Sequence, residues 1–254
     1  MRLTAIGTGT AAPTADAVNA GWMLASGTVQ LLMDCGSGVV HRMATLGIDW
    51  RAISHVAITH FHTDHISDIA TLITAWRYGD RSPRSAPVEF IGPPGTLAML
   101  ERTSALFGAW MLEPGFPLTV RELVDERPAS LGTGLTISAR PVPHSAASVA
   151  YLVARGTRRI VYTGDTGPDE SLGAWAAECD VLVAECSLPR AMAVPAHLTP
   201  EDCAALAAAA RPGLLVLTHR YPPLETVDIA AIVGTRYTGP VVLATDGWTI
   251  ELED

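Results

Sequence analysis

The sequence predicts a layered α/β protein built on mixed β-sheets. Short runs rich in β-branched residues recur along all 254 residues, each bounded by Gly, Pro or Asp. Helix-like stretches separate some of these runs, whereas other runs follow one another directly, and this mixture is typical of mixed sheets. Apolar residues make up 48% of the chain and charged residues 17%, which is the composition of a globular protein.

Ten runs are expected to be strands because they are apolar and end at turn-forming residues. In chain order they span residues 2–7, 29–34, 55–59, 88–92, 135–142, 149–154, 159–164, 181–186, 214–219 and 241–245. Helices are expected near residues 37–47, 65–78, 95–107, 169–178, 200–210 and 225–234. The helix from residue 200 has a well-defined start, because the cap-type Thr199 precedes Pro200 and two acidic residues follow.

Composition excludes several classes of function. The net charge of −9 argues against a broad nucleic-acid surface, which needs clustered basic groups. All 17 basic residues are Arg, so neither a Schiff-base lysine nor a P-loop lysine exists. No window approaches the roughly 18 apolar residues of a membrane span, and the N-terminal apolar run is too short for a signal peptide. We therefore expect a cytoplasmic protein with no membrane association, whose four cysteines are reduced thiols.

One motif suggests a dinucleotide site. Residues 7–12, GTGTAA, fit the pattern GxGxxA after a strand, and Asp34 ends a later strand. That site needs a helix opening at the glycines. Pro13 follows instead, and the next residues, TADAVNAGWMLASG, have no amphipathic helical face and return to strand-like character. We therefore do not expect a dinucleotide.

The stretch 60–65, HFHTDH, holds three of the eight histidines in the chain. His60 and His62 alternate on an extended backbone, so their side chains face the same way, and Asp64 and His65 then turn into a helix. Imidazole with carboxylate suits Zn²⁺, with Mn²⁺ or Fe²⁺ as alternatives. Four donors are too many for one ion that also leaves room for a substrate, so the stretch indicates two ions.

Three further donors stand at the ends of strand-like runs. His144 ends SARPVPH, Asp165 ends IVYTGD and His219 ends LLVLTH. Three separate strand ends that present His, Asp and His form the arrangement that a site at a sheet edge needs.

Over essentially the whole chain, HxHxDH with a distant His, an Asp in a TGDT turn and a last His resembles the metallo-β-lactamase superfamily. The resemblance implies an αββα four-layer sandwich of two mixed sheets flanked by helices, as a single domain over residues 1–254. It also implies two divalent metal ions. One would be held by His60, His62 and His144, the other by Asp64, His65 and His219, with Asp165 as the bridge.

Other motifs are similar to the ribonuclease Z-like phosphodiesterase branch. They are GTGT (7–10), LMDCG (32–36), IGPPG (91–95), AECS (184–187) and HLT (197–199). By this resemblance His197 protonates the leaving oxygen and Glu185 orients it. Asp64, besides binding metal, holds the proton of the nucleophile, and Asp34 fixes an imidazole of the ligand loop.

The chain departs from ribonuclease Z in two places. Residues 66–70 read ISDIA where a Gly-Leu-Pro-Gly-like stretch is usual, and only about twenty residues separate His144 from Asp165, where a basic tRNA-binding arm often lies. We therefore expect a small phosphodiester or nucleotide substrate rather than tRNA.

The expected reaction is attack by a metal-bridging hydroxide on phosphorus. A lactone, thioester or sulfate-ester hydrolase would use the same dinuclear site, and the metal ligands do not choose between these substrates. A non-catalytic metal-binding scaffold is the remaining alternative, but a structural site closes around one ion with four ligands. The mean hydropathy of +0.26 is compatible with a homodimer.

Overall fold

A computed structural model describes residues 1–80, 82, 84–123 and 125–253, and in this part of the chain two seven-stranded sheets form. The first sheet has the order β14 (Thr249–Glu251), β1 (Arg2–Gly7), β2 (Gly21–Ser26), β3 (Val29–Met33), β4 (His55–Ala57), β5 (Val88–Gly92) and β6 (Leu118–Glu122). The second has the order β13 (Val241–Leu243), β12 (Leu214–Thr218), β11 (Val181–Glu185), β10 (Arg158–Tyr162), β9 (Val149–Arg155), β8 (Leu135–Pro141) and β7 (Ala129–Gly132).

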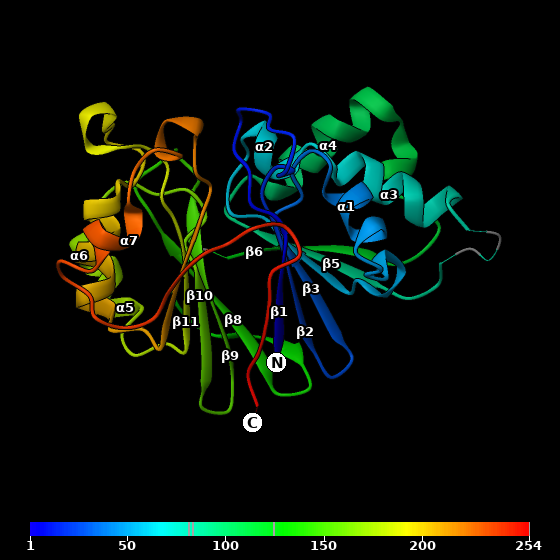
Figure 1. The fold of residues 1–254 in the computed structure, drawn as a ribbon. Coiled ribbons are helices and arrows are strands. Elements are labelled where there is room, and N and C mark those ends of the chain that lie inside the picture. Colours follow the sequence, from blue (N-terminus) through cyan, green and yellow to red (C-terminus); the bar gives the residue numbers. More distant parts are fainter. Residues whose placement is uncertain (81, 83, 124, 254) are drawn as a thin grey trace.

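Helices cover the outer face of each sheet (Figure 1). On the first sheet lie α1 (Val39–Thr45), α2 (Thr63–Ile66), α3 (Ile69–Tyr78) and α4 (Thr96–Phe107), and on the second α5 (Glu170–Trp175), α6 (Pro200–Ala210) and α7 (Ile229–Val233). One apolar cluster fills the space between the sheets, and two others lie under the helices. This is the predicted αββα sandwich of mixed sheets.

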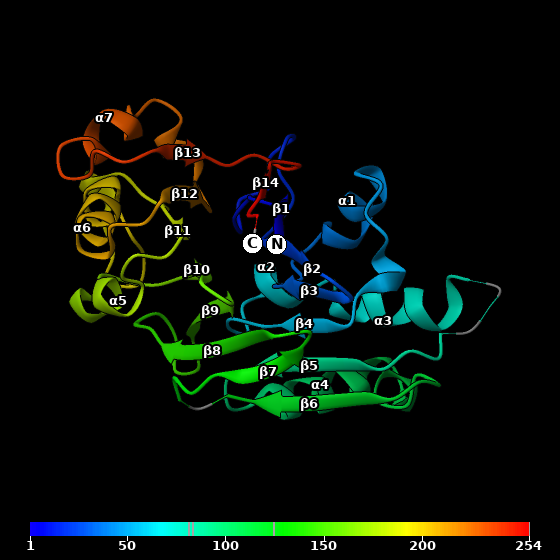
Figure 2. The same ribbon diagram turned by 90° about the horizontal axis from the view of Figure 1, so that it is seen from below.

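The chain returns to the first sheet at its end. From β3 to β6, and again from β10 to β13, neighbouring strands are parallel. After β13 the chain leaves the second sheet, and β14 pairs antiparallel with β1 in the first (Figure 2). Because the ends of parallel strands meet at one edge of a sheet, the loops after β4, β10 and β12 lie on the same side of the sandwich.

Local sequence explains most of the elements. The β11 run VLVAE is buried at every position, as expected of a strand covered on both faces. Helix α6 begins with Thr199 as its cap and Pro200 at its first position, as predicted, and a capping box also links Thr199 with Asp202. No helix follows Gly7, and residues 8–20 instead form a loop that leads into β2, so the dinucleotide motif lacks its helix.

Two expected helices differ from the structure. The stretch 65–78 is divided into α2 and α3, because the Asp68 amide turns away to donate to the Cys35 carbonyl and its carboxylate accepts from Val40 N. The stretch 225–234 is helical only from Ile229, where Asp228 caps α7. Four strands were not predicted: β2, β6, β7 and β14.

All four cysteines are free and buried. Among the described residues, none of the helices combines the length and the apolar character that crossing a bilayer requires.

Candidate metal centre

The seven predicted ligands come together where the two sheets meet. His60, His62, Asp64 and His65 follow β4 of the first sheet. His144 follows β8, Asp165 follows β10 and His219 follows β12, all in the second sheet. Their ligand atoms form two groups, and within each group all of these atoms lie within 4.8 Å of one another. Asp165 belongs to both groups.

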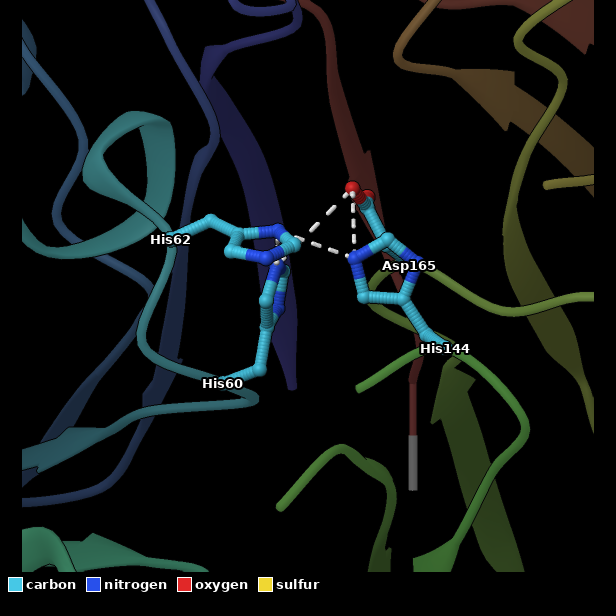
Figure 3. Close-up of side chains that lie close together, drawn as sticks. All are labelled: His60, His62, His144 and Asp165. Carbon is cyan, nitrogen blue, oxygen red and sulfur yellow. Dashed lines mark hydrogen bonds and ion pairs between the residues drawn. The ribbon is translucent and has the colours of Figure 1, made fainter. Parts of the chain in front are cut away.

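The first group consists of three imidazoles and a carboxylate (Figure 3). His62 Nδ1 lies 3.0 Å from His60 Nε2 and 3.0 Å from His144 Nε2. The Oδ2 atom of Asp165 lies 3.9 Å from His60 Nε2 and 3.8 Å from His144 Nε2. The three nitrogens therefore face a common point, and Asp165 faces them from the second sheet.

The second group lies on the other side of Asp165. The Oδ1 atom of Asp165 is 3.3 Å from His65 Nε2 and 3.5 Å from His219 Nε2. Asp64 Oδ2 completes the group, 3.3 Å from His219 Nε2 and 3.9 Å from His65 Nε2. Because Asp165 presents Oδ2 to one group and Oδ1 to the other, its carboxylate has the placement that a bridging ligand needs.

Three of the histidines use the ring nitrogen that points away from the two groups for hydrogen bonds to the rest of the protein. His65 donates Nδ1–H to Asp34 at 2.8 Å, His144 donates to the Ala196 carbonyl at 2.8 Å, and His219 Nδ1 lies 3.1 Å from Ser187 Oγ. This outer contact is the kind that fixes the orientation of a ligating imidazole.

Six buried side-chain polar atoms have no hydrogen-bond partner among the described residues, and two of them, His65 Nε2 and Asp165 Oδ1, belong to the second group. Buried polar atoms are normally paired, so orphans that face each other at 3.3 Å call for a ligand between them. The donor set, with imidazole and carboxylate together, fits divalent cations such as Zn²⁺.

The protonation states of the first group suit metal binding. Burial is the main influence on the pKa of His60 and lowers it to about 2, and nearby His65 acts in the same direction. Burial also lowers the pKa values of His62 and His144. At neutral pH these three imidazoles are uncharged, which is the form that binds a cation.

The two carboxylates are ionised. Burial alone would raise the pKa of Asp64, but the hydrogen bond to His219 and the charge of His65 lower it to about 2. Burial likewise opposes ionisation of Asp165, yet the charges of His219 and His65 hold its pKa well below the usual range. The centre therefore presents two negative charges to a cation.

Beside the second group lies the predicted pair of Glu185 and His197. The Glu185 side chain is fully buried, and His197 Nδ1 donates to its carboxylate at 3.0 and 3.1 Å. Although burial by itself lowers the pKa of His197, the hydrogen bond and charge of Glu185 raise it above the ordinary value. The His197 ring lies 5.9 Å from His219 and 4.9 Å from His144, between centroids, so it borders both groups.

Ser187 and Tyr221 also belong to the site but were not predicted. The Ser187 hydroxyl donates to Glu185 and receives His219 Nδ1–H, so one carboxylate orients both His197 and, through Ser187, His219. The Tyr221 ring packs edge-on against His219, with 5.7 Å between centroids, and lies 6.4 Å from His197. Ser187 stands in the AECS motif, which could have drawn attention to it, whereas no pattern marks Tyr221.

Comparison with known proteins identifies the family. The β-lactamase superfamily domain matches residues 30–220. Ribonuclease Z of Mycobacterium bovis (strain BCG / Pasteur 1173P2) is 30% identical over 278 aligned positions, which cover 99% of this chain and 98% of the relative.

Solved structures show the same fold. The metallo-β-lactamase fold protein YhfI from Bacillus subtilis superposes with a TM-score of 0.85 at 23% identity, over 98% of each chain. The short form of human tRNase Z superposes with a TM-score of 0.82 at 24% identity, over 100% of each chain. The chain thus belongs to the metallo-β-lactamase superfamily, in its ribonuclease Z-like branch.

Proposed function

We propose that this metal-dependent hydrolase cleaves a small phosphodiester with two Zn²⁺ ions and with His197 as proton donor. The main support for this proposal is the buried Glu185 carboxylate, which accepts a hydrogen bond from His197 Nδ1 at 3.0 Å beside both ligand groups. Hydrolysis of an ester with a good leaving group needs no such donor, whereas an alkoxide leaving a phosphodiester does. The pair therefore favours a substrate that releases an alkoxide over a thioester, and among such substrates the similarity to ribonuclease Z favours a phosphodiester over a lactone or a sulfate ester.

The metal ions would be held as the two groups indicate, with Asp165 between them. His60, His62 and His144 would hold one, and Asp64, His65 and His219 the other. When bound, two divalent cations supply an acidified water and positive charge opposite the oxygens of the phosphate. Zn²⁺ is proposed because imidazoles make up three of the four donors in the first group and two of the four in the second.

The protein itself supplies the proton for the leaving group. Since Nδ1 of His197 donates to Glu185, the remaining ring nitrogen, Nε2, is the one that can give a proton to a departing oxygen. Glu185 raises the pKa of His197 and so favours the protonated ring that a proton donor needs. Asp64, ionised and buried beside His219, is placed to accept a proton from the attacking water.

A small substrate is proposed because the chain has little structure beyond the sandwich near the site. Between His144 and Asp165 only β9, a tight turn and β10 are present. The alignment with the M. bovis relative spans 278 positions whereas this chain has 254 residues, so at least two dozen of its positions have no counterpart here. The net charge of −9 also disfavours a polyanion.

Precursor tRNA is the second candidate substrate, because the curated relative is named ribonuclease Z. We further propose that residues 1–254 act as one domain, since each sheet supplies part of the ligand set. The homodimer and the cytoplasmic location stay predictions.

His197→Ala tests the proton donor. On an alkyl phosphodiester, a poor leaving group, kcat should fall by about 10²–10⁴-fold, the usual contribution of general acid catalysis. On an aryl diester, whose leaving group needs no proton, the loss should be below about tenfold by the same reasoning. An equal loss on both substrates contradicts the role.

Substrate size is tested in the same assay with a precursor tRNA. We expect its kcat/KM to be lower than that of the best small diester in the panel. Efficient cleavage at the 3′ end of the tRNA, above every small diester, would reverse the proposal of a small substrate.

A further inference from the structure

Asp246 is a buried carboxylate in the segment that carries the chain from β13 in the second sheet to β14 in the first. Its side chain is only 2% exposed. The Oδ1 atom accepts from Thr8 N at 2.9 Å and from Thr8 Oγ1 at 2.8 Å. The Oδ2 atom accepts from Val18 N at 2.9 Å and lies 3.3 Å from Arg42 Nε. Four donors thus converge on one side chain that lies outside the ligand set.

These contacts hold the loop 8–20 between β1 and β2 at two points, Thr8 and Val18. The same loop contacts the backbone of two predicted ligands of the second group. The Thr8 carbonyl accepts from His219 N at 3.0 Å, and Ala20 N, at the end of the loop, donates to the Asp64 carbonyl at 3.1 Å. Asp246 therefore reaches His219 through two successive hydrogen bonds by way of Thr8. It reaches Asp64 through the hydrogen bond from Val18, the chain from Val18 to Ala20 and the hydrogen bond of Ala20, while no such contact of this loop reaches the ligands of the first group within the described residues.

The His219 backbone needs this support. Its φ is +55°, a left-handed conformation that residues other than glycine rarely adopt. Such a conformation persists only when the surroundings determine it. The hydrogen bond from His219 N to the Thr8 carbonyl is the direct restraint, and Asp246 fixes Thr8 through two further bonds.

The glycines of the GTGT motif make the loop close enough to be clamped. A Cβ on Gly7 would lie 1.8 Å from the Asn19 carbonyl oxygen, and a Cβ on Gly9 would lie 2.8 Å from that of Val18. Gly9 N donates to the Val18 carbonyl at 2.8 Å. The motif therefore serves close contact between the two arms of the loop.

We propose that Asp246 is a positioning residue for the second metal ion, acting through Thr8 on His219 and through the arm 18–20 on Asp64. This inference rests on the dinuclear centre of the proposed function. The segment between β13 and β14, which contains Asp246, would thus contribute to metal binding although it contains none of the predicted ligands.

The test is a Zn²⁺ titration of the metal-free full-length chain with Asp246→Asn, which keeps the size of the side chain but loses an acceptor and the charge. We expect the second equivalent to bind about tenfold more weakly, the lower end of the range for residues that orient metal ligands. The first equivalent should be unchanged. Hydrogen exchange at the His219 amide should become faster, because its acceptor Thr8 is released.

Asp180→Asn is the matched control. Asp180 likewise accepts from a backbone amide, Arg159 N at 2.7 Å, and from an arginine, Arg158 Nη1 at 2.8 Å, but it precedes β11, at the end of the strand away from Glu185. It should leave both equivalents unchanged. His219→Ala removes a ligand of the second ion and should leave one equivalent, bound by the first group. Adding Asp246→Asn to this variant should not change the affinity for that equivalent.

The outcomes separate this inference from the proposed function. A wild-type chain that binds fewer than two equivalents overturns the dinuclear centre and the inference with it. A wild type with two equivalents and an Asp246→Asn variant with both affinities unchanged, or both lowered alike, overturns the inference alone. If Asp246→Asn does not fold, Thr8→Val replaces it, and a smaller loss confined to the second equivalent is expected; equal effects on both equivalents refute the proposal.

Discussion

Replacing Glu185 with Gln tests whether this carboxylate favours the protonated form of His197. The Glu185 carboxylate accepts from Thr166 N at 2.6 Å, Leu198 N at 3.3 Å, His197 Nδ1 and the Ser187 hydroxyl. In either orientation the new NH₂ group would face a backbone N–H, of Thr166 or of Leu198. An unpaired buried donor costs about 1–3 kcal/mol, and each kcal/mol lowers the Tm of a chain of this size by roughly 2–4 °C.

The larger effect should be on catalysis. Without the carboxylate, the largest influence that raises the pKa of His197 is lost, while burial, which lowers it, and the charges of Asp165 and Asp64, which raise it, remain. A smaller share of the enzyme then carries the donor proton at a given pH. The variant should therefore lose kcat/KM on an alkyl phosphodiester at pH 7.5, by up to about 10²–10⁴-fold where orientation is lost as well.

The assay is the pH profile of kcat/KM for an alkyl and an aryl phosphodiester. A proton donor is active below its pKa, so lowering the pKa of His197 moves the basic limb for the alkyl substrate to lower pH. The aryl substrate should hardly respond. Glu178→Gln, an exposed carboxylate paired with Arg211, is the control and should leave the profile unchanged. A basic limb that stays in place in Glu185→Gln would refute the reasoning.

Three further predictions concern the metal centre. Asp34→Asn should weaken Zn²⁺ binding by about 10–100-fold in a chelator competition assay, because Asp34 holds His65 Nδ1 at 2.8 Å, and unchanged affinity would contradict this. Gly36→Ala should destabilise the fold by about 1–3 kcal/mol or more in a thermal melt, because the new Cβ would lie 2.0 Å from the Asp64 carbonyl oxygen. Gly234→Ala is the control and should cost less, because its Cβ would lie 3.1 Å from the nearest atom, the Ala230 carbonyl oxygen. Removing metal with a chelator should abolish hydrolysis and lower the Tm, because a ligand that binds only the folded state stabilises it. Two equivalents of Zn²⁺ per chain should restore both the activity and the Tm. Full recovery with one equivalent would argue against a dinuclear centre.

The sequence was most informative where chemistry and periodicity agree. Parallel strands buried on both faces, such as β11, are apolar at nearly every position and easy to recognise. The ligand histidines stand at strand ends, so finding the strands also places the ligands. Two of the missed strands lack this burial: β6 (LTVRE) is partly exposed along its whole length, and β14 has three residues at a sheet edge. A third, β2 (GWMLAS), is almost fully buried but contains none of the β-branched residues that mark a strand.

The partners of the ligands were harder to predict, because their role depends on contacts between distant segments. Ser187 is separated from His219 by 32 positions, and Asp246 from Thr8 by 238. Neither spacing follows a period of any secondary structure, and a carboxylate in a TDG turn reads as an ordinary turn residue. Only the tertiary fold shows that these side chains meet.

The ligand set is divided between the sheets: β4 carries four of the ligands, and β8, β10 and β12 each carry one. Bound cations would hence fasten the two sheets together at one rim, while the opposite rim is held by apolar packing and by hydrogen bonds from Arg155 to Ser26 and from Arg158 to the Glu253 carbonyl. Without bound metal, the two sheets would separate more readily at the rim that carries the ligands, and proteases could cleave the loops exposed there. The lifetime of the protein in the cell, and not only its turnover of substrate, should then follow the supply of metal.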